Sequence, residues 1–298
     1  MRKKRSEKNL IYLILAIICS SSIALIFKQS ETKNMNRLTV TTANYFTALS
    51  ISFFIILHEN LFSYFKNTEF LSLQKDSPTR AVLLGLFSGV FFFLAFIYYQ
   101  KSVKNNGVGL AGVFAKLGIL IPMFFSVILW QEYPTLIQYS GIILAIFSII
   151  IVNMPFDKNF KKSLRLSLIL LFFYGGIAEF SNKLFQKYSS LKLKPLFLFS
   201  VFTTAFIISL IFTLKKSGRI KKQDIITGLI VGIPNLFSSY FLINALNELK
   251  TAVVFPIFSA GSIIVISLGG FFIFKEKLNN KEISAIFMTI IAMILINL

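Results

Sequence analysis

Residues 107–153 read GVGLAGVFAKLGILIPMFFSVILWQEYPTLIQYSGIILAIFSIIIVN. One long apolar run ends at Trp130, and a second follows the polar turn Gln131–Pro134. The hydrocarbon core of a bilayer is about 30 Å thick, and a helix of about 20 apolar residues crosses it. The stretch therefore predicts two transmembrane helices joined by a tight acidic turn.

The rest of the chain is built in the same way. Most connections between its apolar runs are short and contain residues that end helices. The exception is His58–Arg80, where apolar residues alternate with charges and predict a short amphipathic helix in the membrane interface. We therefore predict an all-α, polytopic membrane protein of about ten transmembrane helices, approximately Leu10–Phe27, Thr41–Leu57, Ala81–Tyr99, Gly107–Trp130, Thr135–Val152, Leu166–Phe185, Pro195–Leu214, Ile225–Leu246, Thr251–Phe274 and Ile283–Leu298.

Composition supports the same class. The 298 residues are 55% hydrophobic and only 14% charged, which is too apolar for a soluble domain. The formal net charge of +19 comes from Lys and Arg in the polar connections, where they mark membrane ends rather than a nucleic-acid site. The single Cys19 and the single His58 exclude an internal disulfide and most zinc or histidine-base chemistry. We predict neither a metal nor a cofactor.

The N-terminal stretch could be misread as a targeting signal. Basic residues at Met1–Arg5 precede the apolar run Leu10–Phe27, as in a signal peptide. The run is longer than the roughly 7–15 residues of a signal core, and no small-x-small cleavage pattern follows it. We interpret it as the first transmembrane helix.

Residues 107–153 have a second copy later in the chain. Placed over residues 251–297, they align Glu132 with Glu276, Ser140 with Ser284, and Asn153 with Asn297. A copy displaced by five spans enters the membrane from the opposite side, as in transporters with inverted repeats. We predict two inverted five-helix repeats, residues 1–154 and 155–298.

These features resemble the EamA-like branch of the drug/metabolite transporter superfamily. The resemblance rests on ten spans in two halves and on an aromatic-x-Glu turn that closes each half, at Trp130–Pro134 and Phe274–Lys277. It implies a secondary transporter, usually an exporter of metabolites or amino acids, with a central cavity between the halves and cytoplasmic termini. Lys116 departs from the commoner pattern, which has small or polar residues there.

The distribution of basic residues does not decide the orientation. Both sides of the predicted membrane collect Lys and Arg, so the positive-inside count is balanced. We predict cytoplasmic termini in a multi-pass plasma membrane protein, because the first helix usually dominates and the resemblance agrees. Frequent Lys, Asn, Ile and Phe are typical of an AT-rich bacterial genome and thus of an inner membrane.

Lys116 is the first candidate site residue. It lies well inside the fourth predicted span, where an ionisable group costs roughly 2.5–3.5 kcal/mol on insertion scales. A lysine there is expected to anchor a substrate carboxylate or phosphate, or to couple proton release to transport. The alternative is a structural lysine paired with a buried carboxylate or reaching the interface.

Further polar candidates lie in the sixth and eighth spans. Glu179 and Lys183 share one helix face, which favours a local ion pair, with a contact from Glu179 to Lys116 or the solute as the alternative. In the eighth span, Asn235, Ser239 and Asn244 belong to a polar strip with Ser238 and Tyr240. Such a strip either joins helices or lines a cavity.

Prolines and glycines complete the set of candidates. Pro122, and Pro256 with Gly261, interrupt corresponding spans, so they mark either a midplane site or a static kink. The pairs Gly85 with Gly89 and Gly175 with Gly176 predict close helix packing.

We predict a secondary transporter, an exporter of a small metabolite such as an amino acid or organic anion. It would work by alternating access around a central cavity, driven by a proton, ion or solute gradient. The chain has no nucleotide-binding loop and no catalytic constellation, so we do not expect an enzyme. A membrane-embedded enzyme, a lipid-handling protein and a passive channel are the alternatives. The expected partners are the solute and the bilayer, with no nucleic acid, in a monomer or a weak homodimer.

Overall fold

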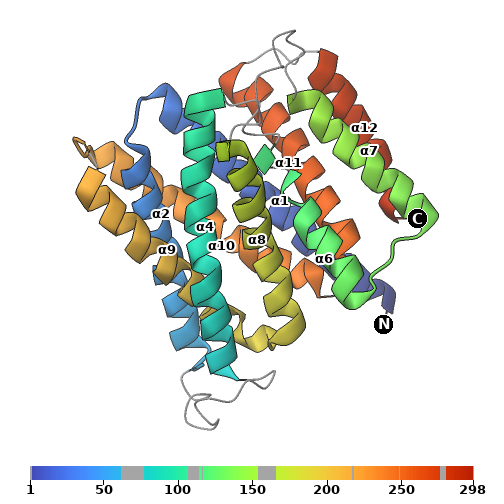
Figure 1. Cartoon of the computed structure of the whole chain (residues 1–298), viewed down its shortest axis with the longest axis horizontal. Coiled ribbons are helices and arrows are strands. Elements are labelled where there is room, and N and C mark those ends of the chain that lie inside the picture. The colour runs from blue at the N-terminus through green and yellow to red at the C-terminus, as the bar shows by residue number, and fades with distance from the viewer. Residues whose placement is uncertain are drawn as a thin grey trace. The chain divides into compact units, whose positions relative to one another are not determined.

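The computed structural model describes residues 2–61, 77–106, 114–115, 117–153, 166–216, 218–247, 249–275 and 280–297 (Figure 1). These residues form helices and their connections and include no strand, which confirms the all-α prediction. Lys116 and Glu276 lie outside the described residues, as does most of the predicted interfacial helix between His58 and Arg80.

Each described α-helix overlaps one predicted apolar run, although α1 and α4 extend beyond theirs and α6 begins only at Leu120. Seven of them are long and apolar enough to cross a membrane, while α6 and the apolar part of α7 are shorter. A count of ten crossings and the inverted repeats stay predictions. The ten described α-helices are α1 (Arg2–Thr32), α2 (Arg37–His58), α4 (Pro78–Asn106), α6 (Leu120–Trp130), α7 (Leu136–Asn153), α8 (Leu166–Tyr188), α9 (Lys194–Lys216), α10 (Lys222–Leu246), α11 (Thr251–Phe274) and α12 (Asn280–Asn297), with a 3-10 turn η1 (Leu191–Leu193) before α9.

Side-chain caps set where several helices begin. Asn36 accepts a hydrogen bond from the Thr39 N–H and starts α2. Thr135 and Gln138 bond reciprocally to each other's backbone N–H groups before α7. Asp224 accepts from the Lys221 N–H at the start of α10. Such caps satisfy N–H groups that the first helical turn leaves without a partner.

Contacts divide the chain into two compact units. Unit 1 comprises Met1–Phe93 and Ser181–Asn247, and unit 2 comprises Leu94–Phe180 and Glu248–Leu298. Each unit therefore takes helices from both halves of the sequence. Packing defines the units, whereas the predicted boundary near residue 154 concerns sequence order and stays a prediction.

Unit 1 is organised around α2, α9 and α10. Helix α10 packs on α1 and α2, and α2 also packs on α9. Phe185 and Phe197 stack with their ring centroids 4.4 Å apart, and both are fully buried. Buried aromatic and aliphatic side chains of α9 thus form much of the core of this unit.

Two pairs of glycines bring helices of unit 1 into backbone contact. A Cβ added at Gly85 would lie 2.5 Å from the carbonyl oxygen of Phe197, and one at Gly89 would meet that of Val201. On α10, a Cβ at Gly228 would meet the Val40 carbonyl, and one at Gly232 would lie 2.5 Å from the carbonyl oxygen of Asn44. The predicted close packing at Gly85 and Gly89 is confirmed, because only a residue without a Cβ allows this approach.

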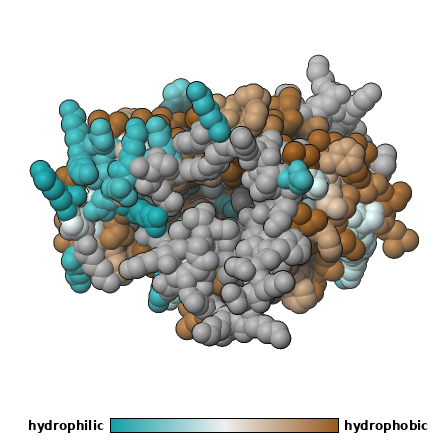
Figure 2. Space-filling view, turned by 90° about the horizontal axis from the view of Figure 1, so that it is seen from above, coloured by the Kyte–Doolittle hydropathy of each residue, from teal (hydrophilic) through white to brown (hydrophobic). Residues whose placement is uncertain are grey.

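One end of unit 1 is basic. Lys215, Arg219, Lys221 and Lys222 are exposed around the connection between α9 and α10. Figure 2, which looks onto this end, shows hydrophilic side chains gathered over that connection. Leu214 and Ile220 are exposed among them, and this mixture of basic and apolar side chains is typical of a membrane interface.

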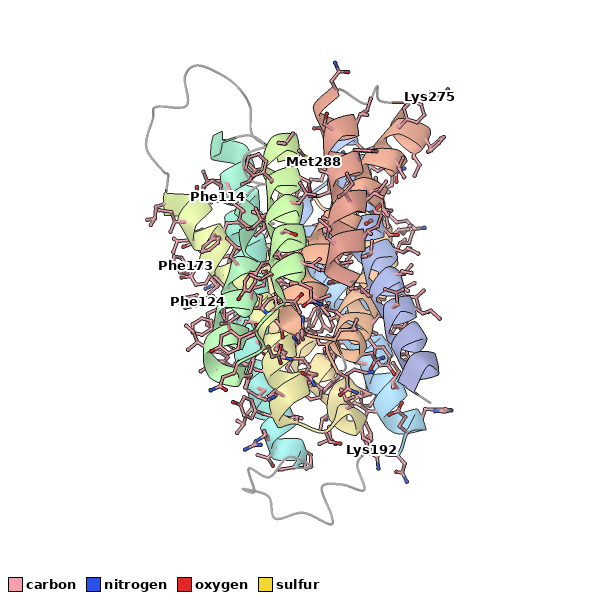
Figure 3. The ribbon with its side chains drawn as sticks, turned by 90° about the vertical axis from the view of Figure 1, so that its right-hand side faces the viewer. Phe114, Phe124, Phe173, Lys192, Lys275 and Met288 are labelled. Atoms are coloured by element: carbon pink, nitrogen blue, oxygen red, sulfur yellow. The ribbon has the colours of Figure 1, made fainter. Side chains whose placement is uncertain are left out.

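Unit 2 is organised around α11. This helix contacts α6, α7 and α12, and α7 runs beside α12 (Figure 1). Residues 251–263 of α11 are all buried. Phe124 and Phe173 are instead exposed and point outward (Figure 3). An exposed aromatic surface on an apolar helix is expected to face lipid.

Helices α6 and α11 of unit 2 end in the same way. Gln131 follows α6 with φ 52° and ψ 36°, and Lys275 follows α11 with φ 54° and ψ 31°. Each is the residue that precedes the glutamate of an aromatic-x-Glu turn. A left-handed residue ends a helix by turning the chain away from its axis, so the sequence motif corresponds to a shared backbone turn at these two helix ends.

Candidate functional site

One polar cluster of unit 1 centres on the buried Lys194. This lysine is the first residue of α9 and is only 5% exposed. The preceding 3-10 turn η1 and the buried Leu193 and Phe197 hold its backbone. In contrast, Lys192 in the same turn is exposed at the end of the helices (Figure 3).

Two neutral groups of α10 contact the Lys194 ammonium. Nζ donates a hydrogen bond of 2.6 Å to Oδ1 of Asn244. The same atom lies 3.3 Å from the ring centroid of Tyr240, which is the geometry of a cation–π interaction. The predicted strip residue Asn244 thus lies in a site that also contains a cation.

An aromatic cluster and one carboxylate surround this contact. Tyr240 packs edge-on against Phe241, and Phe241 stacks on Tyr12 with centroids 6.1 Å apart. Glu59, which is exposed at the C-terminal end of α2, acts electrostatically on both Lys194 and Tyr240. Among the described residues, Lys194 forms no direct ion pair.

Other polar residues of α10 join helices. Asn235 Nδ2 donates to Asn44 Oδ1 at 3.0 Å, which ties α10 to α2. Ser238 Oγ reaches the Ala16 carbonyl oxygen of α1 at 3.5 Å, and Ser239 beside it is buried. The hydrogen bonds of Asn235 and Ser238 favour the helix-joining interpretation of this part of the strip.

The glutamate of the first acidic turn has a defined structural role. Glu132 Oε2 accepts a hydrogen bond of 2.9 Å from the backbone N–H of Thr251, the first residue of α11. Lys250 Nζ donates to the carbonyl oxygen of Tyr133 at 2.8 Å. A carboxylate at a helix N-terminus is favourable both as a hydrogen-bond acceptor and toward the helix dipole.

The remaining predicted site residues fall in different places. Lys116 is outside the described residues. Glu179 is half-buried on α8, and Lys183 is only 3% exposed on the same helix. Both take part in interactions, so neither is a lone charge. Their predicted mutual ion pair stays a prediction.

The two predicted helix-breaking prolines differ in their surroundings. Gly118 and Ile119 form a turn before Pro122, and the Ile121 N–H bonds to the Gly118 carbonyl at 3.0 Å. In a regular α-helix the Gly118 carbonyl would accept from residue 122, but Pro122 has no N–H and its ring crowds that carbonyl. The carbonyl accepts instead from Ile121, which is only three residues away. Helix α11 instead runs without a break through Pro256 and the buried Gly261.

The sequence of the whole chain matches one family twice. Residues 8–154 and again residues 162–298 match the profile of the EamA-like transporter family. The chain belongs to the EamA-like transporter family. The resemblance inferred from the aromatic-x-Glu turns is thereby confirmed, and with its apolar helices this EamA-like protein is a multi-pass membrane protein.

Two relatives and one solved structure resemble this EamA-like protein. It is 26% identical over 274 residues to an uncharacterized protein of Haemophilus influenzae, covering 90% of each chain. It is 26% identical over 161 residues to an uncharacterized transporter in the trpA 3′ region of Buchnera aphidicola subsp. Schlechtendalia chinensis, covering 53% of this chain and 50% of the relative. A crystal structure with 12% identity superposes with a TM-score of 0.71 over 97% of this chain and 96% of the other, which shows a shared fold.

Sequence reasoning missed the central residue of the Lys194 cluster. Lys194 directly precedes Pro195, where the seventh predicted span begins, so its position indicates an interface charge. Asn44 is one of several polar residues in the second predicted span, and nothing in the sequence distinguishes it from the others. A polar residue in a predicted span is a sign of a helix contact, but its partner cannot be read from the sequence.

Proposed function

We propose that this EamA-like protein is a secondary transporter that exports a small metabolite, an amino acid or an organic anion. It works by alternating access between two inverted five-helix repeats, residues 1–154 and 155–298. The observation that carries the proposal is a reciprocal pair of glycine contacts in unit 1, in which α4 packs on α9 and α10 packs on α2. Family membership supports transport as the general activity.

The reciprocal contact links helices at matching positions of the two halves. Gly85 and Gly89 of α4, the third predicted span, lie on α9, the seventh. Gly228 and Gly232 of α10, the eighth predicted span, lie on α2, the second. The third helix of each half thus packs on the second helix of the other half. A two-fold axis between the halves produces this exchange, which supports the proposed repeats.

Inverted repeats supply a mechanism for transport. Two halves with opposite orientations can adopt each other's conformation, so one rocking motion closes one side of the membrane and opens the other. The matching left-handed turns at Gln131 and Lys275 agree with such a duplication. We place both termini in the cytoplasm, and we place the solute near the middle of the membrane, with Lys116 as its cationic anchor.

Counterflow in proteoliposomes tests this function. The purified protein is reconstituted, loaded with unlabelled solute and offered labelled amino acids, organic acids, sugar phosphates or amines. We expect accumulation of one anionic or zwitterionic class by the wild type and its loss in Lys116→Ala. Lys192→Ala, which removes an exposed lysine, is the matched control and should transport normally.

One result would contradict the proposed transport, and another would contradict the role of Lys116. Absence of counterflow for the whole panel would oppose transport of these metabolites and favour the enzyme or channel alternatives. Equal counterflow in wild type and Lys116→Ala would retain transport and remove Lys116 from the site.

A further inference from the structure

The chemistry of the Lys194 cluster goes beyond helix packing. Lysine is among the residues that are almost never fully buried unless a partner compensates the charge. Here the two direct contacts, Asn244 and Tyr240, are both neutral. Among the described residues no carboxylate lies within ion-pair distance of Nζ, so the buried cation is left with capacity for an anion.

Hydrogen-bond donors gather at the same place. The ammonium of Lys194 has three N–H donors, and Asn244 takes one of them. Because Oδ1 of Asn244 accepts this bond, its amide nitrogen carries two donors that have no partner in the described part of the chain. The site thus offers a positive charge and several hydrogen-bond donors, and the Asn244 oxygen already accepts a bond from Lys194. Such a set of groups suits an oxyanion.

The tyrosine ring is the replaceable contact. Tyr240 and Asn244 are half-buried, whereas Lys194 beneath them is buried. A cation–π contact is weaker than a desolvated ion pair, so an anion that moves the ring aside gains the stronger interaction. The aromatic neighbours Phe237 and Phe241 offer the displaced ring other apolar surfaces.

Glu59 is the charged group that opposes an incoming anion. It acts on Lys194 and Tyr240 from the exposed end of α2. Its charge keeps the site from being strongly positive and would weaken the binding of a second carboxylate. Removal of this charge should therefore tighten binding, which a purely structural role of Lys194 does not predict.

We propose that Lys194 and Asn244 form an anion-binding site, covered by the Tyr240 ring, at the membrane end where α9 begins and α10 ends. A carboxylate or phosphate of the transported metabolite would lie against the Lys194 ammonium, in the place that the Tyr240 ring now occupies. The inference rests on the proposed transport function and deepens it. It assigns an acidic metabolite as the solute. It also adds a second solute-binding site, near the membrane surface, to the site proposed near the middle of the membrane.

Ligand-dependent thermal stability of the full-length purified protein tests the site without transport. The melting temperature is followed in detergent against glutamate, succinate and inorganic phosphate, with chloride at matched ionic strength as the reference. Ligands that bind the folded state raise the melting temperature in a concentration-dependent way, which gives an apparent Kd. We expect at least one probe to bind the wild type.

Variants assign the binding to the cluster. Lys194→Met should raise the apparent Kd at least tenfold, and the exposed-lysine control Lys192→Met should leave it unchanged. Glu59→Gln should lower the Kd. If Lys194→Met does not fold, Lys194→Arg and Tyr240→Leu replace it. Lys194→Arg keeps the charge and should retain anion binding. Tyr240→Leu uncovers the ammonium and should strengthen anion binding.

Three outcomes would overturn a metabolite site at Lys194, and a fourth would separate the site from transport. No shift of the wild type by any of the three probes, or the same Kd in wild type and Lys194→Met, opposes anion binding at Lys194. Mixed micelles with phosphatidylglycerol or phosphatidylcholine form a second arm. If the probe binds in phosphatidylcholine micelles but not in phosphatidylglycerol micelles, the anionic headgroup occupies the site. The site then belongs to a lipid and not to the metabolite. Binding that survives in a protein without counterflow would reject the proposed transport and retain the site.

Discussion

Glu132 and Thr251 are joined across the sequence by a hydrogen bond of 2.9 Å from the Thr251 N–H to Oε2 of the glutamate. The residue before the helix, Lys250, provides no side-chain cap of its own. Its ammonium instead bonds to the Tyr133 carbonyl, which holds the acidic turn against the start of α11. The family's aromatic-x-Glu turn therefore acts here as a cap for a distant helix.

Loss of this cap should destabilise the protein. We expect Glu132→Ala to lower the free energy of unfolding by about 1–2 kcal/mol, because the Thr251 N–H at the start of α11 loses its acceptor. Glu132→Gln keeps an oxygen acceptor and should cost less. Unfolding by increasing SDS in mixed micelles measures both changes.

Salt provides the control for this prediction. Attraction between a carboxylate and the positive end of a helix is screened at high ionic strength, whereas a short hydrogen bond is not. The difference in stability between wild type and Glu132→Ala should therefore keep most of its size in concentrated sodium chloride. Its disappearance there would show that general charge, and not the hydrogen bond to Thr251, stabilises the helix.

The asparagine pair between α2 and α10 should be energetically coupled. In a double-mutant cycle of Asn44→Ala and Asn235→Ala, we expect a coupling free energy of about 0.6–1.7 kcal/mol, which spans the average and the maximum for polar contacts between membrane helices. The pair is 3.0 Å apart, so one substitution leaves the other amide without this partner.

A non-contacting pair tests the specificity of that coupling. Thr213 is buried and hydrogen-bonded to Thr42 of α2 at 2.7 Å, and no hydrogen bond joins it to Asn235. Thr213→Ala combined with Asn235→Ala should be additive. Additivity in the asparagine cycle as well would mean that the 3.0 Å contact contributes nothing measurable.

Two adjacent glycines of α8 should respond in opposite ways to alanine. A Cβ at Gly176 would lie 2.5 Å from both the Gly118 carbonyl oxygen and the Ile121 Cδ1, so Gly176→Ala should cost about 1–3 kcal/mol. Gly175 has open space around it, and Gly175→Ala should be neutral or stabilise by up to about 1 kcal/mol through helix propensity.

Thermal unfolding of the two alanine variants in the same detergent checks this contrast. The prediction of close packing at both glycines was right for Gly176 and wrong for Gly175. Because neighbouring residues on a helix point in different directions, only one of two adjacent glycines can face a given partner. Equal effects of the two substitutions would refute the packing role assigned to Gly176.

The sequence was informative wherever one segment carries its own physical constraint. Hydrophobic length predicted the helices, because a bilayer leaves no water to satisfy backbone groups and each span must be helical and apolar. Turn residues predicted the ends of α6 and α11 closely, at Trp130 and Phe274. Local steric rules also placed a disturbance near Pro122, since proline acts on the carbonyl four residues before it.

Partners that lie far apart in the chain were beyond the reach of such rules. Asn244 was a candidate by itself, but its contact with Lys194 depends on how α9 and α10 pack. Pro122 follows a turn while Pro256 lies within an intact helix, although the two belong to equivalent predicted spans. Membrane helices tolerate a proline where neighbouring helices or local backbone adjustments satisfy the groups that it frees, and the sequence does not show where that happens.

By itself the sequence determined the class of this protein: apolar helices of membrane length, basic connections between them and a family with two matching halves. Tertiary structure alone decided which polar groups meet. It set Glu132 against α11, Asn235 against Asn44, and Lys194 beneath Tyr240. The physical reason is that helix formation in a membrane is a local response to an apolar environment, whereas a buried polar contact requires two segments to approach within about 3 Å of each other.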